Sequence, residues 1–140
     1  HDHGVAIGLF NRLTSIEDRG PHKGKINLKY NGILPLVESI RLLALREGVA
    51  DTSTLDRIGS LHEKGILNGD EQDYLSGAFA FLTELVLRQQ IDDFNSNNPV
   101  GPFLAPDRIT EREKDILINS LKSIKDFRSK VHTEFSAEIF

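Results

Sequence analysis

The chain has 140 residues, of which 39% are hydrophobic and 27% charged, with a net charge of −4 and no cysteine. This composition is ordinary for one globular domain with its own core. It excludes disulfides and thiolate metal sites, and the acidic balance argues against a protein that coats nucleic acid. No apolar run approaches the roughly 20 residues that span a bilayer, and the first residues lack the features of a signal peptide. We therefore expect a soluble cytoplasmic domain and, because methionine is also absent, one part of a longer protein.

The N-terminal segment, residues 1–24, holds scattered apolar side chains and ends in the turn-rich sequence RGPHKG. We interpret it as a lead-in or as the tail of a preceding domain. Lys25–Tyr30 then alternates polar and apolar side chains, which predicts a short strand. Leu9–Ser15 is the expected partner of this strand in a small hairpin.

Helical periodicity begins after residue 33, where apolar side chains recur every three or four positions. The first predicted helix begins near Pro35, which a first helical turn accommodates, and stops at Gly48. The second predicted helix is short, with a capping residue at Ser53 and an end at Gly65.

The third and fourth predicted helices are long. Asn68 and Glu71 form a capping pair for the third, which we expect to run to about Phe94 with an inward-facing apolar stripe that ends at Ile91. Thr110 opens the last helix with a similar capping box.

The segment between these helices, Asn95–Ile109, contains three prolines and cannot be helical. We expect it to be ordered, because prolines restrict the unfolded chain and apolar residues can anchor the loop. Phe103 or Leu104 is expected to pack over one end of the bundle, and the loop could also border a substrate cleft.

These stripes predict an all-α fold, a four-helix-type bundle over residues 25–140 with a short extended or hairpin lead-in. The predicted core residues are Leu36, Ile40, Leu43, Leu55, Ile58, Leu75, Phe79, Leu82, Leu117, Leu121, Ile124 and Phe127.

Several short motifs occur in order along this bundle. LK-x-x-G-I-L-P spans Leu28–Pro35, an arginine follows at Arg41, and S-T-L-D-R spans Ser53–Arg57. L-R-Q-Q at Leu87–Gln90 and AP-x-x-I-T at Ala105–Thr110 come later. In this order the motifs resemble the nucleotidyltransferase substrate-binding domain, the C-terminal helical domain of certain bacterial signalling proteins.

The resemblance implies a domain that is not catalytic alone. In the family it follows a catalytic domain related to protein-PII uridylyltransferase, often with CBS and cyclic-nucleotide-binding domains upstream. Mg²⁺ and a nucleoside triphosphate are expected for that parent enzyme rather than for this chain. The implied partners are the catalytic domain, an acceptor protein or nucleotide, and a second copy of the chain; nucleic acid and membranes are not expected. The polar positions carried over from the family as substrate-binding residues are Lys29, Arg41, Arg57, Arg88 and Gln90.

The pattern of carboxylates agrees with a missing catalytic centre. A nucleotidyltransferase holds Mg²⁺ against the triphosphate with clustered carboxylates, usually in a Gly-Ser motif followed by Asp-x-Asp. Gly-Ser occurs here only at Gly59-Ser60, within a predicted helix, and no Asp-x-Asp follows.

Two alternatives remain open. In the first, the arginines pair with carboxylates and brace the bundle, and the chain is a structural or dimerisation module. The carboxylates within reach in sequence are Glu38, Asp56, Glu84 and Asp92. In the second, the chain is a metal-independent ribonuclease-like bundle that uses Arg57 and His62, although five positions place these about 140° apart around a helix.

Overall fold

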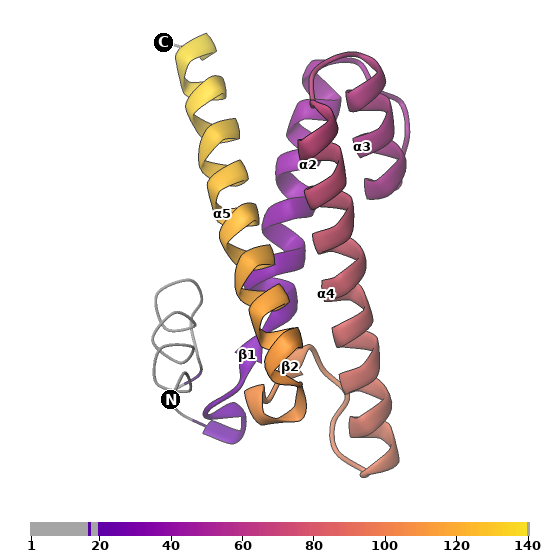
Figure 1. Cartoon of the computed structure of the whole chain (residues 1–140), viewed down its shortest axis with the longest axis vertical. Coiled ribbons are helices and arrows are strands. Elements are labelled where there is room, and N and C mark those ends of the chain that lie inside the picture. Colours follow the sequence, from indigo (N-terminus) through magenta and orange to yellow (C-terminus); the bar gives the residue numbers. More distant parts are fainter. Residues whose placement is uncertain (1–16, 18–19, 140) are drawn as a thin grey trace.

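The computed structural model describes residue 17 and residues 20–139, and its helices form the predicted all-α bundle (Figure 1). Three helices, α2 (Leu34–Arg46), α4 (Gly69–Asn95) and α5 (Glu111–Ile139), make up most of it. The short helix α3 (Thr54–Glu63) connects α2 to α4 at one end. The remaining elements are the 3₁₀ turns η1 (Gly20–His22) and η3 (Pro106–Arg108), the π-helical turn η2 (Lys29–Ile33), and the strands β1 (Ile26–Asn27) and β2 (Phe103–Leu104).

The helices form an up-and-down arrangement in which α2 and α5 run in the same direction and α4 runs antiparallel to both (Figure 1). Both α5 and α3 pack against α2 and α4. Among the residues described, no helix is both long enough and apolar enough to cross a membrane.

The helix starts follow the predicted capping residues. Asn68 Oδ1 accepts a hydrogen bond from the Glu71 amide (2.8 Å), and Glu71 Oε1 accepts one from the Asn68 amide (3.0 Å). Thr110 and Glu113 form the same reciprocal pair at the start of α5. Ser53 caps α3 through its hydroxyl. These side chains satisfy amide groups that have no partner within the helix.

The strand that the sequence predicts over residues 25–30 is shorter in the structure, and it pairs with the loop before α5. Ile26 pairs with Leu104 and Asn27 with Phe103, in antiparallel register. The chain leaves the strand after Asn27 because the Asn27 side chain accepts a hydrogen bond from the Tyr30 amide (2.9 Å), which starts a helical turn. The expected hairpin partner, residues 9–15, lies outside the described residues.

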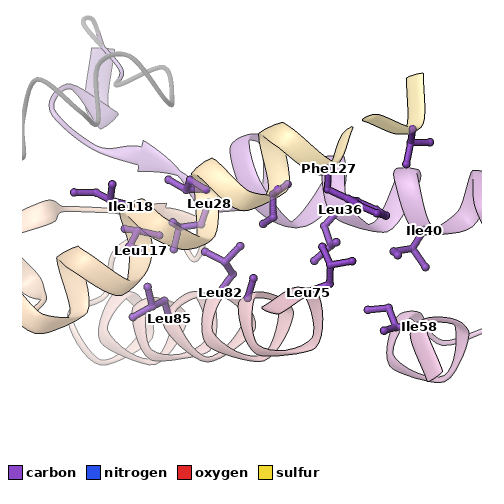
Figure 2. Close-up of a cluster of buried hydrophobic side chains, with 14 of the residues drawn as sticks. Leu28, Leu36, Ile40, Ile58, Leu75, Leu82, Leu85, Leu117, Ile118 and Phe127 are labelled. Carbon is purple, nitrogen blue, oxygen red and sulfur yellow. The ribbon is translucent and has the colours of Figure 1, made fainter. Parts of the chain in front are cut away.

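The core is one apolar cluster to which α2, α3, α4 and α5 all contribute (Figure 2). The predicted core residues are buried with two exceptions: Phe79 is partly buried, and Leu55 is 46% exposed. The prediction for Leu55 is wrong because this residue occupies the first turn of α3, before the two side chains, Ile58 and Leu61, that anchor this short helix in the core.

The inward-facing stripe of α4 also departs from the prediction near its C-terminal end. Ile91 is 51% exposed, and the buried face there carries Gln89 and Asp93 instead. Asp93 accepts hydrogen bonds from Gln89 Nε2 (3.0 Å) and from the Gly101 amide (3.2 Å). A polar network that fastens the following loop therefore replaces the expected apolar contact.

The long loop before α5 is ordered, as predicted. Leu104 is 3% exposed and belongs to the core, which confirms that this loop packs over one end of the bundle. The neighbouring Phe103 stacks on the His22 ring, with centroids 3.7 Å apart.

Candidate functional site

A groove of about 400 Å³ lies between the start of α2 and the middle of α5. Its floor is apolar and includes the buried Leu121 and Ile124, while its rims are polar and open to solvent. The lining residues are Tyr30, Asn31, Leu34, Pro35, Glu38, Leu121, Ile124, Lys125 and Arg128.

Helical spacing explains why these side chains share one groove. The α5 residues 121, 124, 125 and 128 are three or four positions apart and therefore lie on one face of the helix. The rim across from them begins in η2, whose close approach depends on Gly32. A Cβ on Gly32 would lie 2.8 Å from Leu82 Cδ1 and 3.1 Å from Leu121 Cδ2. The glycine thus lets η2 press against α4 and α5 and places Tyr30 and Asn31 at the groove.

The α5 rim of the groove is positively charged. Lys125 and Arg128 are exposed, and neither forms an ion pair or a side-chain hydrogen bond within the described part of the chain. Among the described residues, Glu38 is the one acidic side chain that lines the groove. On the same side as Glu38, the Tyr30 side chain is 70% exposed. The groove therefore combines two available cations, an aromatic ring and an amide side chain over an apolar floor.

Two of the five carried-over residues lie on elements that border this groove, Lys29 on η2 and Arg41 on α2. Lys29 immediately precedes the lining residue Tyr30 and is exposed. Arg41 is exposed and follows Leu34 by seven positions and Glu38 by three, so it continues their side of α2. Neither cation has a hydrogen-bond or ion-pair partner among residues 17 and 20–139.

Two of the five are engaged elsewhere. Arg57 Nε donates to the Asp51 carbonyl (2.8 Å) and braces the loop before α3. Arg88 Nη1 pairs with Glu113 Oε2 (2.5 Å) and joins α4 to the start of α5. The bracing alternative thus has support at these two arginines, although their partners are not the carboxylates considered from sequence.

Gln90, the last of the five, lies on α4 and is partly exposed. Arg57, Arg88 and Gln90 do not line the groove. The structure therefore places Lys29 on η2 and Arg41 on α2, next to lining residues of the groove, and leaves the other three on α3 and α4.

Sequence reasoning missed the two cations of the α5 rim. A signal was present, because Lys122, Lys125 and Arg128 recur every three positions along α5. Such repeats are common on solvated helix faces, and only the packing of α2 beside α5 distinguishes Lys125 and Arg128 from Lys122.

The residues of the ribonuclease alternative bond to backbone carbonyls of two different loops. Arg57 contacts Asp51, and His62 Nδ1 lies 2.9 Å from the Leu67 carbonyl oxygen. No group of three or more His, Asp or Glu side chains in the described residues is placed to hold a metal ion.

Comparison with known proteins gives one match. The comparisons with curated proteins and with solved structures found no match. A family model described as "putative nucleotidyltransferase substrate binding domain" matches residues 1–135. This match spans nearly the whole chain, including the lead-in, α2, α3, α4 and most of α5. The chain therefore belongs to the family of nucleotidyltransferase substrate-binding domains.

Proposed function

We propose that this domain holds a nucleotide substrate in the groove between α2 and α5 for a nucleotidyltransferase whose catalytic centre lies on another domain. The observation that carries the proposal is a pair of cations, Lys125 and Arg128, that have no ion-pair partner among the described residues and that line one groove together with Tyr30 and Asn31. The family membership supplies the chemical context.

The phosphates would bind at the α5 rim. Lys125 and Arg128 are one helical turn apart, so their side chains project to the same side about 5–6 Å apart at Cβ. Arginine binds phosphate oxygens through two parallel N–H donors, and lysine contributes a point charge. Lys29 on η2 and Arg41 on α2, which have no ion pair among the described residues, add positive charge near the groove.

The base would bind near the start of α2. The exposed Tyr30 ring offers a face for stacking, an interaction that contributes about 1–3 kcal/mol per base in single-stranded nucleic acid complexes. Asn31 offers both a donor and acceptors for the edge of a base. Its side-chain amide already donates to the Asn27 carbonyl (3.1 Å), which holds it in place.

The transfer reaction itself would need a partner domain. Mg²⁺ catalysis of nucleotidyl transfer requires clustered carboxylates, and in the described part of the chain Glu38 is the one carboxylate that lines the groove. We propose a catalytic domain related to protein-PII uridylyltransferase as the partner, in a cytoplasmic bacterial signalling protein with CBS or cyclic-nucleotide-binding domains. That domain would bind Mg²⁺ and the triphosphate together with this groove, and the acceptor would be a protein or a second nucleotide.

Calorimetric titration with nucleoside triphosphates tests the proposal. Binding should weaken as the salt concentration rises from ~0.05 to ~0.5 M, since screening shortens the range of charge attraction. Lys125→Ala and Arg128→Ala should each weaken binding about tenfold, or ~1.4 kcal/mol. Lys122→Ala is the matched control, because Lys122 is exposed on the same helix but does not line the groove.

Equal losses in all three variants, or salt-independent binding, would contradict the groove as the site. Nucleotidyl transfer by the isolated chain with Mg²⁺ would contradict the non-catalytic role.

The second candidate function is a purely structural module. The internal contacts of Arg57 and Arg88 favour it. Absence of any nucleotide binding, with a normally folded chain, would support this candidate over the first.

A further inference from the structure

The C-terminal half of α4 carries large apolar side chains on its solvent face. Leu87, Ile91 and Phe94 are 56, 51 and 75% exposed. They are four and three positions apart, so they form one row along the helix. The same turns bury Leu85 and Gln89 on the opposite face. An exposed row of this kind marks an interaction surface.

The N-terminal half of the same face carries small side chains. Gly77 and Ala80 are exposed, and a Cβ on Gly77 would meet nothing within 4 Å. Ala80 precedes Leu87 by seven positions, so both lie on one side of α4. The outer face therefore changes from small residues at one end to large apolar residues at the other.

We propose that this face, defined by Gly77, Ala80, Leu87, Ile91 and Phe94, pairs with the same face of a second copy of the chain, with the two α4 helices antiparallel. In that alignment Phe94 of one copy lies over Gly77 of the other, and Ile91 lies over Ala80. Large side chains then fill the space above small ones at both ends of the contact, while Glu84 of each copy lies over Leu87 of the other at its centre. The contact is isologous, as expected for a two-fold dimer.

Charge complementarity favours a second copy in this orientation. Glu84 belongs to the row, four positions after Ala80 and three before Leu87, and Arg88 lies beside it on one flank. The antiparallel alignment puts Glu84 of each copy beside Arg88 of the other. Opposite charges on the flanks of paired helices select partner and orientation. A parallel pair would instead place Glu84 beside Glu84 and Phe94 beside Phe94. Arg88 contacts Glu113 through Nη1, and its remaining N–H donors are free to reach across.

The proposal is independent of nucleotide binding. The groove is lined by η2, α2 and α5 and includes no α4 residue, so a dimer through α4 leaves both grooves open. The row from Gly77 to Phe94 is about 26 Å long. A single pair of helices of this length buries less surface than the about 800 Å² per partner of a standard stable interface. We therefore expect a dissociation constant in the micromolar range.

Sedimentation velocity over a range of concentrations tests the dimer. The mass should rise from that of the 15.7 kDa chain toward twice that value. Ile91→Glu should weaken association at least about tenfold and shift the sample toward monomer at each concentration, because a buried charge without a partner is costly. Ile116→Glu is the matched control: Ile116 is 39% exposed on α5, and its variant should associate like the parent. A monomer at every concentration, or equal behaviour of the two variants, would overturn the proposal.

Disulfide trapping tests the antiparallel orientation of the two α4 helices. Because the chain has no cysteine, any cross-link must involve the introduced ones. A mixture of Ala80→Cys and Ile91→Cys chains should form a cross-linked heterodimer under mild oxidation, while each variant alone stays largely uncross-linked. Strong cross-linking of Ala80→Cys alone would indicate a parallel pair and would overturn the alignment. If Ile91→Glu abolishes only the attachment of a separate catalytic domain, that domain is the occupant and the dimer is wrong.

Discussion

A Cβ atom placed on Gly32 would lie 2.8 Å from Cδ1 of Leu82, closer than packed carbon atoms allow. Gly32 is buried in η2, and Leu82 is 0% exposed in the middle of α4. This contact fixes how closely the start of the domain approaches the core, and with it the position of one wall of the groove.

Substituting Gly32 by alanine should therefore destabilise the fold. We expect a loss of about 1–3 kcal/mol in the free energy of unfolding, because a methyl group is forced into a filled core. Urea denaturation followed by circular dichroism measures it. Gly59→Ala is the control: Gly59 lies within α3 with nothing within 4 Å of its Cβ position, so alanine should stabilise that helix by about 0.5–1 kcal/mol. A neutral Gly32→Ala would show that Leu82 can move aside.

The ordered conformation of the loop before α5 should depend on the buried carboxylate of Asp93. Asp93→Ala removes the acceptor for Gln89 and for the Gly101 amide, and buried donors without partners cost about 1–3 kcal/mol. We expect a comparable loss of stability and faster proteolysis within residues 96–102. Asp92→Ala is the matched control, because Asp92 is the exposed neighbour on the same helix. Equal cleavage rates in the two variants would show that the loop is held by Leu104 alone.

Acid should weaken the junction of α4 and α5. The hydrogen bond from Arg88, together with the capping bonds of Thr110, lowers the pKa of Glu113 from its ordinary 4.5 to about 2. Because the folded-state pKa is the lower one, the carboxylate stabilises the fold above about pH 4.5, and this contribution disappears as the pH falls toward 2.

Glu113→Gln should remove that part of the acid sensitivity. At pH 6 the variant should be less stable by roughly 1 kcal/mol, a modest figure because the Arg88 side chain is 45% exposed and water screens the pair. The difference from the parent chain should shrink by pH 2.5. Glu63→Gln at the exposed end of α3 serves as the control. Parallel stability curves for parent and Glu113→Gln would refute the assignment.

Local features of the sequence predicted the helices better than they predicted the neighbours of each helix. The capping boxes involve residues three positions apart, so Asn68 and Thr110 could be identified without tertiary structure. The exposure of Leu55 and Ile91 could not be predicted in this way. An apolar stripe shows which face of a helix is apolar, but not how much of that face a neighbouring helix covers.

Contacts between distant segments escaped prediction for a related reason. Ile26 pairs with Leu104, and nothing local distinguishes this partner from a hairpin. The groove has the same origin, since Lys125 and Arg128 become binding candidates only when the start of α2 lies beside them. The family resemblance pointed to Lys29 and Arg41, which are on the η2–α2 segment near the groove but do not line it, and it carried no signal for α5.

Two arginines on α2, Arg46 and Arg41, are expected to have different roles, Arg46 in stabilising the fold and Arg41 in binding the nucleotide. Arg46 pairs with Glu47 (2.7 Å), with Glu134 (3.4 Å) and with Glu138 (3.1 Å), and its guanidinium lies 5.5 Å from the centre of the Phe135 ring. It therefore fastens the last turns of α5 to α2.

Arg46→Ala should lower the free energy of unfolding by about 1–2 kcal/mol, since a network with a cation–π contact exceeds a single surface pair. Amide hydrogen exchange should accelerate over residues 131–138. Arg41→Ala should change stability by less than about 0.5 kcal/mol, because Arg41 is exposed and has no partner among the described residues. Its effect should appear in nucleotide affinity instead. A large stability loss in Arg41→Ala would assign that arginine to bracing and remove it from the binding surface.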